Sequence, residues 1–146
     1  MAATANQVEP HVLVFVFGTL KKGFPLHNRG LSEARLIGAY RTQERFPLVI
    51  AGPWFAPMMF NEPGEGHHIL GEVYQVDVAQ LATLDRIESV GKPGNCRLTI
   101  DLEAASSGGR VSAFGYMKSR EIAQGIYHSG YLESYHDHRF VPIEAR

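Results

Sequence analysis

The sequence predicts an α+β domain that is built mostly of strands and has one well-defined helix. An unbroken apolar run spans residues 12–17, and an amphipathic pattern of helical period spans 77–88. Two strand-like segments at 97–102 and 111–117 flank a glycine-containing turn. Strands and helices do not alternate along the chain, which argues against a doubly wound parallel sheet.

The apolar run Val12–Phe17 is the first expected element. Its β-branched and aromatic residues occupy successive positions, as in a strand that is buried on both faces. The run stops at Gly18, and a loop follows to Gly23. Backbone N–H groups that gather in such a turn can form a concave anion site, and Gly18 allows close approach because it lacks a Cβ. The loop is therefore a candidate site for a carboxylate or phosphate, with an ordinary turn as the alternative.

Two common nucleotide-binding loops do not fit this segment. The spacing from Gly18 to Gly23 matches the first half of a P-loop, but Phe24 and Pro25 follow where that motif needs Lys and Ser or Thr. The dinucleotide-binding pattern also fails, because Leu20 stands in place of its second glycine. The loop is therefore not a standard nucleotide cradle.

The segments between the loop and the helix are shorter and less regular. We expect strands at 34–41, 46–51 and 69–76, a short helical turn at most at 24–31, and a loop at 61–68. Residues 54–60 are apolar, but Pro57 restricts them to an edge strand or an irregular wall.

Residues 77–88 form the best helix candidate. Asp77 is a good N-cap, and Gln80, three residues later, suits a capping box. Gly91, Pro93 and Gly94 are expected to end the helix. One apolar stripe is formed by Val78, Leu81, Leu84 and Ile87.

The rest of the chain indicates one domain. The segments 97–102 and 111–117 are expected to form a hairpin around 106–109, while 119–146 is rich in Tyr and His with little periodicity. A chain of 146 residues suits a single domain, which can bury about 68–70% of its unfolded surface. We expect this domain to span residues 11–146, preceded by a disordered leader at 1–10.

Composition excludes several classes of protein. With 14 basic and 15 acidic residues, the net charge of −1 gives no electrostatic reason to expect nucleic acid or an anionic membrane as a partner. Cys96 is the only cysteine, so an intrachain disulfide is excluded. No apolar run approaches the ~20 residues of a membrane span, and residues 1–10 lack the features of a signal peptide. We therefore expect a soluble cytoplasmic protein, whose oligomeric state the sequence does not indicate.

Several motifs occur in an order that resembles the gamma-glutamyl cyclotransferase-like family. The first strand is followed by Gly-Thr-Leu-Lys-Lys-Gly at 18–23, close to the family's usual Tyr-Gly-Thr-Leu-(Arg/Lys)-x-Gly, and Asn28 fits the Asn that commonly follows. Further matches are Pro-Leu-Val-Ile-Ala-Gly at 47–52, Gly-Glu-Val-Tyr-Gln-Val-Asp at 71–77 and Leu-Asp-Arg-Ile-Glu-Ser at 84–89. The set covers about 14–117 and is similar to the gamma-glutamylamine cyclotransferase branch in particular.

The resemblance implies a fold, a reaction and a site. The fold is a small mixed β-barrel with flanking helices, in which the glycine loop borders a cavity. In the family's reaction the α-amino group of a gamma-glutamyl unit attacks its own gamma carbonyl, closes the 5-oxoproline ring and expels an amine. The resemblance assigns catalysis to Glu88, in its Leu-Asp-x-x-Glu context, and substrate binding to Phe17, Gly18, Thr19 and Leu20. This reaction needs no metal and no organic cofactor.

Glu88 also stands out on physical grounds. It follows Leu84 by four residues and Leu81 by seven, so on a helix it shares their inward face. Burial and the helix C-terminus should both raise the pKa of its carboxyl, which suits a general base or acid near neutral pH. The alternative is a Glu that turns to solvent at a frayed helix end. Asp85 lies off the stripe, where solvent or a salt bridge is expected.

Two positions depart from the family pattern. Phe17 replaces the usual Tyr, and a lost hydroxyl that bonded the substrate would cost about 0.5–1.5 kcal/mol. Asn95 stands two residues before Arg97, where the family usually has another Tyr. This second departure concerns the fit of the pocket wall.

Histidine and cysteine offer other kinds of site. The sequence contains the pairs His67-His68 and His136-x-His138, but a metal centre needs three or four convergent ligands and nothing fixes the distance between the pairs. We expect surface histidines and no metal. No local motif marks Cys96 as a nucleophile, and we expect a small buried residue at the start of a strand.

The sequence thus predicts an enzyme that releases 5-oxoproline from gamma-glutamylamines such as gamma-glutamyl-ε-lysine. The leaving amine is expected to contact residues 54–60. Two alternatives stay open, which are a non-catalytic small-molecule binding module of the same fold and a cyclotransferase that acts on other gamma-glutamyl peptides.

Overall fold

Five strands close into a barrel in the computed structural model, which describes residues 11–146. Their order around the barrel is β1-β5-β2-β6-β7, and each neighbouring pair is antiparallel except β1 and β7. The parallel pairing of Val14 with Phe114 closes the barrel. The strands are β1 (His11–Val16), β2 (Arg35–Phe46), β5 (His67–Asp77), β6 (Asn95–Ala104) and β7 (Arg110–Lys118). The expected small mixed barrel is confirmed.

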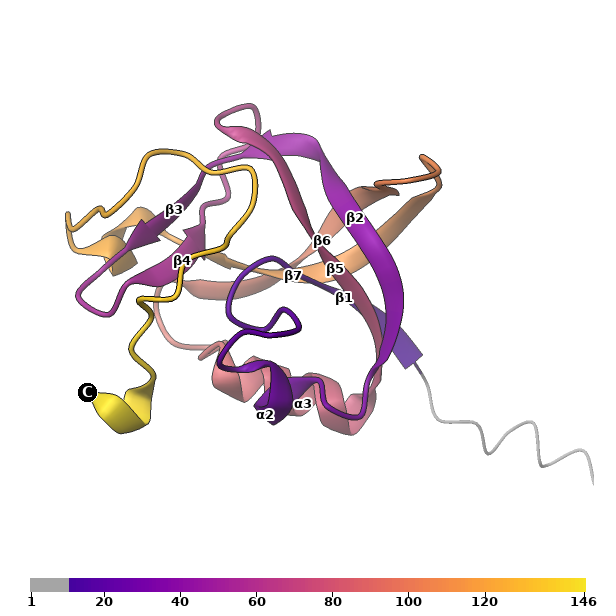
Figure 1. The fold of residues 1–146 in the computed structure, drawn as a ribbon, viewed down its shortest axis with the longest axis horizontal. Coiled ribbons are helices and arrows are strands. Elements are labelled where there is room, and N and C mark those ends of the chain that lie inside the picture. Colours follow the sequence, from indigo (N-terminus) through magenta and orange to yellow (C-terminus); the bar gives the residue numbers. More distant parts are fainter. Residues whose placement is uncertain (1–10) are drawn as a thin grey trace, which may run out of the picture.

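The other elements lie beside this barrel. A separate two-stranded sheet contains β3 (Leu48–Ala51) and β4 (Ala56–Met59), and Pro57 within β4 is tolerated because this strand has only one partner. Two α-helices, α2 (His27–Gly30) and α3 (Val78–Ile87), lie together at the lower end of the barrel in Figure 1. The C-terminal segment passes β3 and β4 before ending near the helices (Figure 1) and carries the 3₁₀ turns η1 (Arg120–Ala123) and η2 (Ile143–Ala145).

β1 is buried on both faces, as its unbroken apolar run predicts. Phe15 points into the main core of the barrel, whereas Val14 and Val16 pack with Leu84 in a second core beneath α3. β1 therefore contributes to both cores. The Gly18 loop, which follows its C-terminal end, lies at the boundary between the barrel and the helices.

The capping box of α3 forms as predicted. Asp77 Oδ1 accepts a hydrogen bond from the Gln80 N–H at 2.7 Å, and the Asp77 N–H donates to Gln80 Oε1 at 2.8 Å. The apolar stripe is only partly correct. Leu84 is fully buried, but Val78 is 57% exposed, because α3 packs on the barrel through its C-terminal half and its first turn faces solvent.

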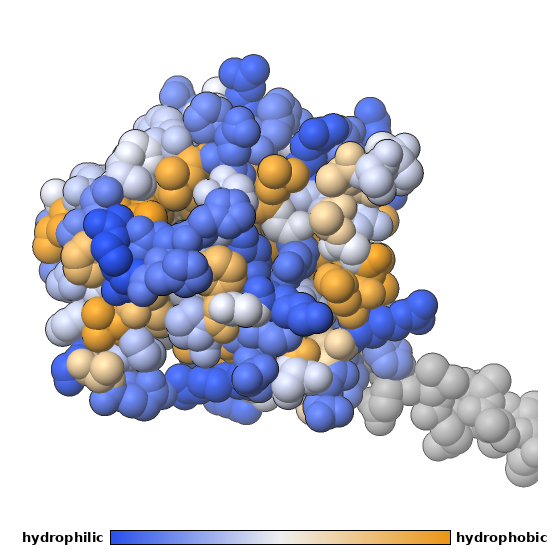
Figure 2. Space-filling view, viewed as in Figure 1, coloured by the Kyte–Doolittle hydropathy of each residue, from blue (hydrophilic) through white to orange (hydrophobic). Residues whose placement is uncertain are grey.

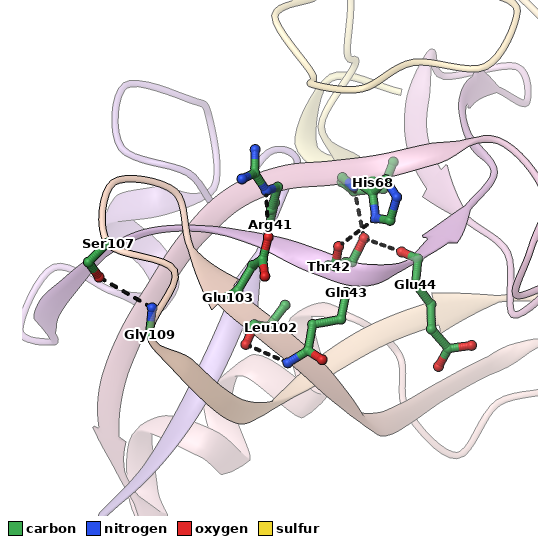
Figure 3. Close-up of polar contacts among 10 residues, drawn as sticks. Arg41, Thr42, Gln43, Glu44, His68, Leu102, Glu103, Ser107 and Gly109 are labelled. Carbon is green, nitrogen blue, oxygen red and sulfur yellow. Dashed lines mark hydrogen bonds and ion pairs between the residues drawn. The ribbon is translucent and has the colours of Figure 1, made fainter.

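β2 is longer than its sequence suggests. The expected strand 34–41 continues to Phe46, across a shift in its pairing with β5 between Arg41 and Arg45. Thr42 lies in this shift, where its hydroxyl accepts from the Ile69 N–H at 2.8 Å and donates to the Glu44 carbonyl at 2.6 Å (Figure 3). A side chain thus replaces the missing ladder bonds. Pro47 separates β2 from β3, so the expected strand 46–51 is shorter than predicted.

On the face seen in Figure 2, apolar residues are scattered among hydrophilic ones. Cys96 is exposed, so its predicted burial is wrong: it is the second residue of β6, where the strand begins and its side chain faces solvent. No helix within residues 11–146 is long and apolar enough to cross a membrane. The predicted leader 1–10 lies outside the described residues.

Candidate active site

A cavity of about 700 Å³ lies where the loop after β1, the strand β4, the end of α3, the end of β7 and the C-terminal segment meet. This volume is typical of pockets that enclose small molecules. Among the residues that line it are Glu88 and all four predicted substrate-binding residues, Phe17, Gly18, Thr19 and Leu20. The fold therefore brings every predicted site residue to one cavity.

The Gly18 loop presents unused backbone donors to this cavity. The loop is closed by hydrogen bonds from the Lys21 N–H to the Gly18 carbonyl at 3.0 Å and from the Leu26 N–H to the Thr19 carbonyl at 2.9 Å. Within residues 11–146, the N–H groups of Gly18, Thr19 and Leu20 donate to no protein acceptor, although all three residues are buried. Buried N–H groups are nearly always paired, so three successive free ones indicate a site for an anionic ligand.

The structure adds a second reason for glycine at position 18, besides the close ligand approach expected from the sequence. Its φ is not in the left-handed region, so no backbone strain excludes a side chain. A Cβ at this position would lie 2.6 Å from Cγ of Pro57 in β4. Glycine is required because β4 packs directly on the loop, and this contact sets one boundary of the cavity.

Phe17 lies between the cavity and the barrel core. The residue is buried, and its ring centroid is 6.0 Å from that of Phe15. Without the family's hydroxyl, Phe17 contributes an apolar ring and shape to the cavity, and no hydrogen bond from its side chain.

At the end of α3 the chain turns away from the helix directly after Glu88. Glu88 is the C-cap, and Ser89 follows it with a left-handed φ of 56°. The Val90 N–H donates to the Asp85 carbonyl at 2.9 Å and the Ser89 N–H to the Arg86 carbonyl at 3.1 Å, which is the Schellman pattern. The helix thus ends at Glu88 as predicted, but the left-handed residue after it is Ser89 and not the expected glycine, although non-glycine residues rarely adopt this conformation.

The Glu88 carboxylate is partly buried and only weakly paired. Its side chain is 20% exposed, and its Oε2 lies 3.6 Å from Lys118 Nζ, which is longer than a hydrogen bond. Burial raises the pKa of the Glu88 carboxyl above its ordinary value, and the Lys118 charge opposes that rise only in part. A carboxyl whose pKa is moved toward neutrality in this way suits proton transfer.

Asp85 has the opposite environment, as expected for a structural residue. Its Oδ2 lies 2.5 Å from Arg97 Nη1, and its Oδ1 accepts a hydrogen bond from the Tyr116 hydroxyl at 2.8 Å. Burial and the hydrogen bond to Asp85 raise the pKa of the Tyr116 hydroxyl, which therefore stays protonated as a donor. Both oxygens of Asp85 are engaged, so the expected salt bridge is confirmed.

Lys118 is a site residue that the sequence did not reveal. It is the last residue of β7, and its Nζ donates to Asn95 Oδ1 at 2.7 Å. Asn95, which replaces the family's usual Tyr, therefore anchors the cation beside Glu88. The predicted hairpin stopped at Met117, and no local pattern marks the next residue as part of a cavity.

The C-terminal segment contributes a further wall that the sequence did not predict. Phe140, Ile143 and Arg146 line the cavity together with Trp54. The Val141 N–H donates to the Trp54 carbonyl at 2.9 Å, and the Arg146 guanidinium lies over the Trp54 ring at 5.1 Å. These contacts join segments that are far apart in sequence and have no periodic pattern.

The histidines of the two predicted pairs, His67-His68 and His136-x-His138, lie outside the lining of the cavity. His68 Nδ1 is 3.0 Å from the Thr42 carbonyl oxygen, and His138 stacks on Phe24 with centroids 5.3 Å apart. Across residues 11–146 no group of three or more His, Cys, Asp or Glu side chains is arranged to hold a metal ion.

Comparison with known proteins identifies the family. The family profile described as "Gamma-glutamyl cyclotransferase, AIG2-like" matches residues 14–135. A gamma-glutamylaminecyclotransferase of Bos taurus is 38% identical over 91% of this chain and 83% of its own length, and that of Homo sapiens is 37% identical over 92% and 99%. The crystal structure of an AIG2-like protein from Mus musculus superposes with a TM-score of 0.81 at 33% identity, covering 93% of this chain and 99% of that one. The chain therefore belongs to the gamma-glutamyl cyclotransferase, AIG2-like family.

Proposed function

We propose that this cyclotransferase cleaves gamma-glutamylamines into 5-oxoproline and a free amine, with Glu88 as the general base. Relatives from cattle and human, which this chain matches over most of their lengths, are named for action on gamma-glutamylamines. The observation that carries the proposal is the meeting of a weakly paired carboxylate and three free backbone N–H groups in one cavity.

The loop supplies binding in this proposal. The N–H groups of Gly18, Thr19 and Leu20 hold the α-carboxylate of the gamma-glutamyl unit, because they are buried backbone donors at the cavity that have no acceptor within residues 11–146. Fixing this carboxylate folds the short gamma-glutamyl chain back on itself. The attack is intramolecular, so correct positioning accounts for a large part of the rate enhancement.

Glu88 supplies the proton transfers. The carboxylate takes a proton from the substrate's α-ammonium, and the free amine attacks the gamma carbonyl carbon. As the bond to the leaving amine breaks, the protonated Glu88 returns this proton to the leaving nitrogen. The regenerated carboxylate then takes the second proton from the ring nitrogen and passes it to the released amine, so 5-oxoproline keeps one lactam N–H and the amine departs as an ammonium. A raised pKa makes Glu88 a better acid for this last step while it still acts as a base near neutral pH.

The wall formed by Trp54, β4 and the C-terminal segment holds the leaving amine. Trp54, Pro57 and Met58 give this wall an apolar surface, and Phe140 extends it. Such a surface suits the alkyl chain of an amine such as the ε-amino end of lysine. The charge in this wall is the Arg146 guanidinium over the Trp54 ring, which suits the carboxylate at the far end of a lysine leaving group. Leaving groups that carry their carboxylate next to the cleaved bond, as in gamma-glutamyl α-amino acids, present that charge to the apolar side chains of Pro57 and Met58.

The test is a panel of gamma-glutamyl compounds with release of 5-oxoproline as the readout. We expect faster release from gamma-glutamyl-ε-lysine and gamma-glutamyl alkylamines than from gamma-glutamyl α-amino acids. The reverse order would favour a cyclotransferase for other gamma-glutamyl peptides. Binding of these compounds without any release would favour the non-catalytic module.

A cytoplasmic location is part of the proposal. It is supported by the single cysteine, Cys96, which is exposed and in a free state. Cell fractionation with detection of the untagged protein tests it, and enrichment in a membrane or secreted fraction would contradict it.

A further inference from the structure

Lys118 brings an ammonium group to the same wall of the cavity as Glu88. Its side chain is 17% exposed, and lysine is seldom buried to this extent without a reason. The 3.6 Å between Nζ and Glu88 Oε2 makes this contact an ion pair that is longer than a hydrogen bond, so Glu88 attracts the ammonium without closely engaging its N–H groups. The cation is held near the base and not directly on it.

The Lys118 ammonium retains donors for a ligand. An ammonium has three N–H groups, and one of them donates to Asn95 Oδ1 at 2.7 Å. Within residues 11–146 the other two N–H groups have no acceptor at hydrogen-bond distance, since the ion-paired Glu88 Oε2 lies 3.6 Å away, and Lys118 lines the cavity. Asn95 has no charge of its own, so it fixes the ammonium without neutralising it.

The reaction places a carbonyl oxygen in this region. A substrate whose α-ammonium bonds to Glu88 must bring its carbonyl carbon to about 3–3.5 Å from that nitrogen before the ring can close. The carbonyl oxygen is bonded to the same carbon and therefore lies beside the immediate neighbours of Glu88. Lys118 is the cation that forms an ion pair with Glu88, with Nζ 3.6 Å from Oε2.

We propose, on the basis of the function above, that Lys118 is a second catalytic residue that stabilises the oxyanion formed when the ring closes. As the bond from the α-nitrogen to the carbonyl carbon forms, the electron pair of the C=O double bond moves to oxygen. Two Lys118 N–H groups donate hydrogen bonds to the resulting oxyanion. When the bond to the leaving amine breaks, the pair returns and the 5-oxoproline carbonyl is restored. The proton travels through Glu88, so Lys118 stays an ammonium throughout.

A purely indirect role for Lys118 makes a different prediction. In that case its charge only keeps Glu88 ionised, and the ammonium never touches the substrate. The groups that face Lys118 are the Glu88 carboxylate from the end of α3 and the neutral Asn95 amide from β6. On its own strand the Tyr116 hydroxyl is committed to Asp85, whose charge Arg97 balances. Glu88 is therefore the titrating group through which an indirect role would act.

The experiment compares Lys118→Met with the wild type across a pH series, using gamma-glutamyl-ε-lysine as substrate. We expect kcat to fall about 10²–10³-fold, as for loss of one oxyanion donor. The loss should persist at pH values above the Glu88 titration, where the base is ionised in both proteins. Binding of 5-oxoproline, measured by calorimetry, should be retained because the loop still holds the carboxylate.

Two further variants complete the test. Lys118→Arg keeps the charge and should recover part of the lost kcat, which also covers the case in which the Met variant folds poorly. Lys22→Met removes an exposed lysine that does not line the cavity and should behave as the wild type.

The possible outcomes separate this inference from the function on which it rests. Turnover of Lys118→Met that returns to the wild-type level at high pH would overturn the direct role, as would wild-type turnover at every pH. Absence of 5-oxoproline release by the wild type itself would instead overturn the proposed function, and the role of Lys118 with it.

Discussion

The cavity has two walls that are built in different ways. The Gly18 loop presents backbone N–H groups, and its shape is fixed by hydrogen bonds inside the loop and by the close contact with Pro57. The wall formed by α3 and β7 presents the side-chain charges of Glu88 and Lys118, which are 30 positions apart in sequence and meet only in the folded barrel. The first wall is suited to holding a substrate anion, and the second to moving a proton. We therefore expect changes in the loop to alter binding and changes at the second wall to alter kcat.

Gly18→Val gives the largest expected effect on the loop wall. The side chain would collide with Pro57, whose Cγ lies 2.6 Å from the position of a Cβ, and would displace the three N–H groups. We expect no measurable binding of 5-oxoproline in calorimetry. Gly23→Ala is the control, because its Cβ meets open space and only the positive φ of 88° is unfavourable, so binding should be retained with a small loss of stability. Unchanged affinity in a folded Gly18→Val protein would exclude the loop as the binding wall.

Asp85→Asn tests whether the two carboxylates at the end of α3 differ as their surroundings indicate. The change weakens the pairing with Arg97 and the bond from Tyr116, so the free energy of unfolding should fall by about 1–3 kcal/mol with kcat largely kept. Asp101→Asn, at an exposed Asp bonded only to Ser112, should be close to neutral in the same urea titration. A loss of kcat in Asp85→Asn without loss of stability would make Asp85 the catalytic carboxylate.

Glu88→Gln should have a smaller effect on stability, of opposite sign and dependent on pH. Burial raises the folded-state pKa of Glu88 above its ordinary value of 4.5, so the ionised group destabilises the folded state. The folded wild type is most stable while Glu88 is protonated, and part of its free energy of unfolding is lost as the pH rises from the unfolded-state pKa of Glu88 through the folded-state pKa. Glu88→Gln should therefore melt at the same or a slightly higher temperature at pH 7, with the advantage vanishing below about pH 4. A lower melting temperature at pH 7 would show that Glu88 has a structural role.

Phe17→Tyr gives the smallest expected effect. The added hydroxyl restores the family's usual residue at the cavity edge and offers one neutral hydrogen bond, worth about 0.5–1.5 kcal/mol. The KM for gamma-glutamyl-ε-lysine should fall while kcat stays unchanged. A change in kcat with constant KM would place this ring in the chemistry and not in binding.

The two walls also differ in how far the sequence predicts them. The strand, the glycine loop and α3 with its capping box are encoded by local patterns, so their existence and the candidates Gly18 and Glu88 could be identified from the residues and their resemblance to a family. Lys118 has no local signal, because its role depends on how the β6–β7 hairpin closes the barrel beside α3. Arg146 likewise lies in the site because of its tertiary contact with Trp54, which no periodic pattern in the sequence predicts.

The central claim is that Glu88 is the general base, and kinetics of Glu88→Gln test it most directly. Gln keeps the size of Glu but cannot accept the substrate's proton, and loss of a positioned base costs about 10²–10⁴-fold. We predict that kcat for 5-oxoproline release from gamma-glutamyl-ε-lysine falls by at least this factor, while 5-oxoproline still binds to the intact loop. Turnover at the wild-type rate in a folded Glu88→Gln protein would contradict the proposed mechanism.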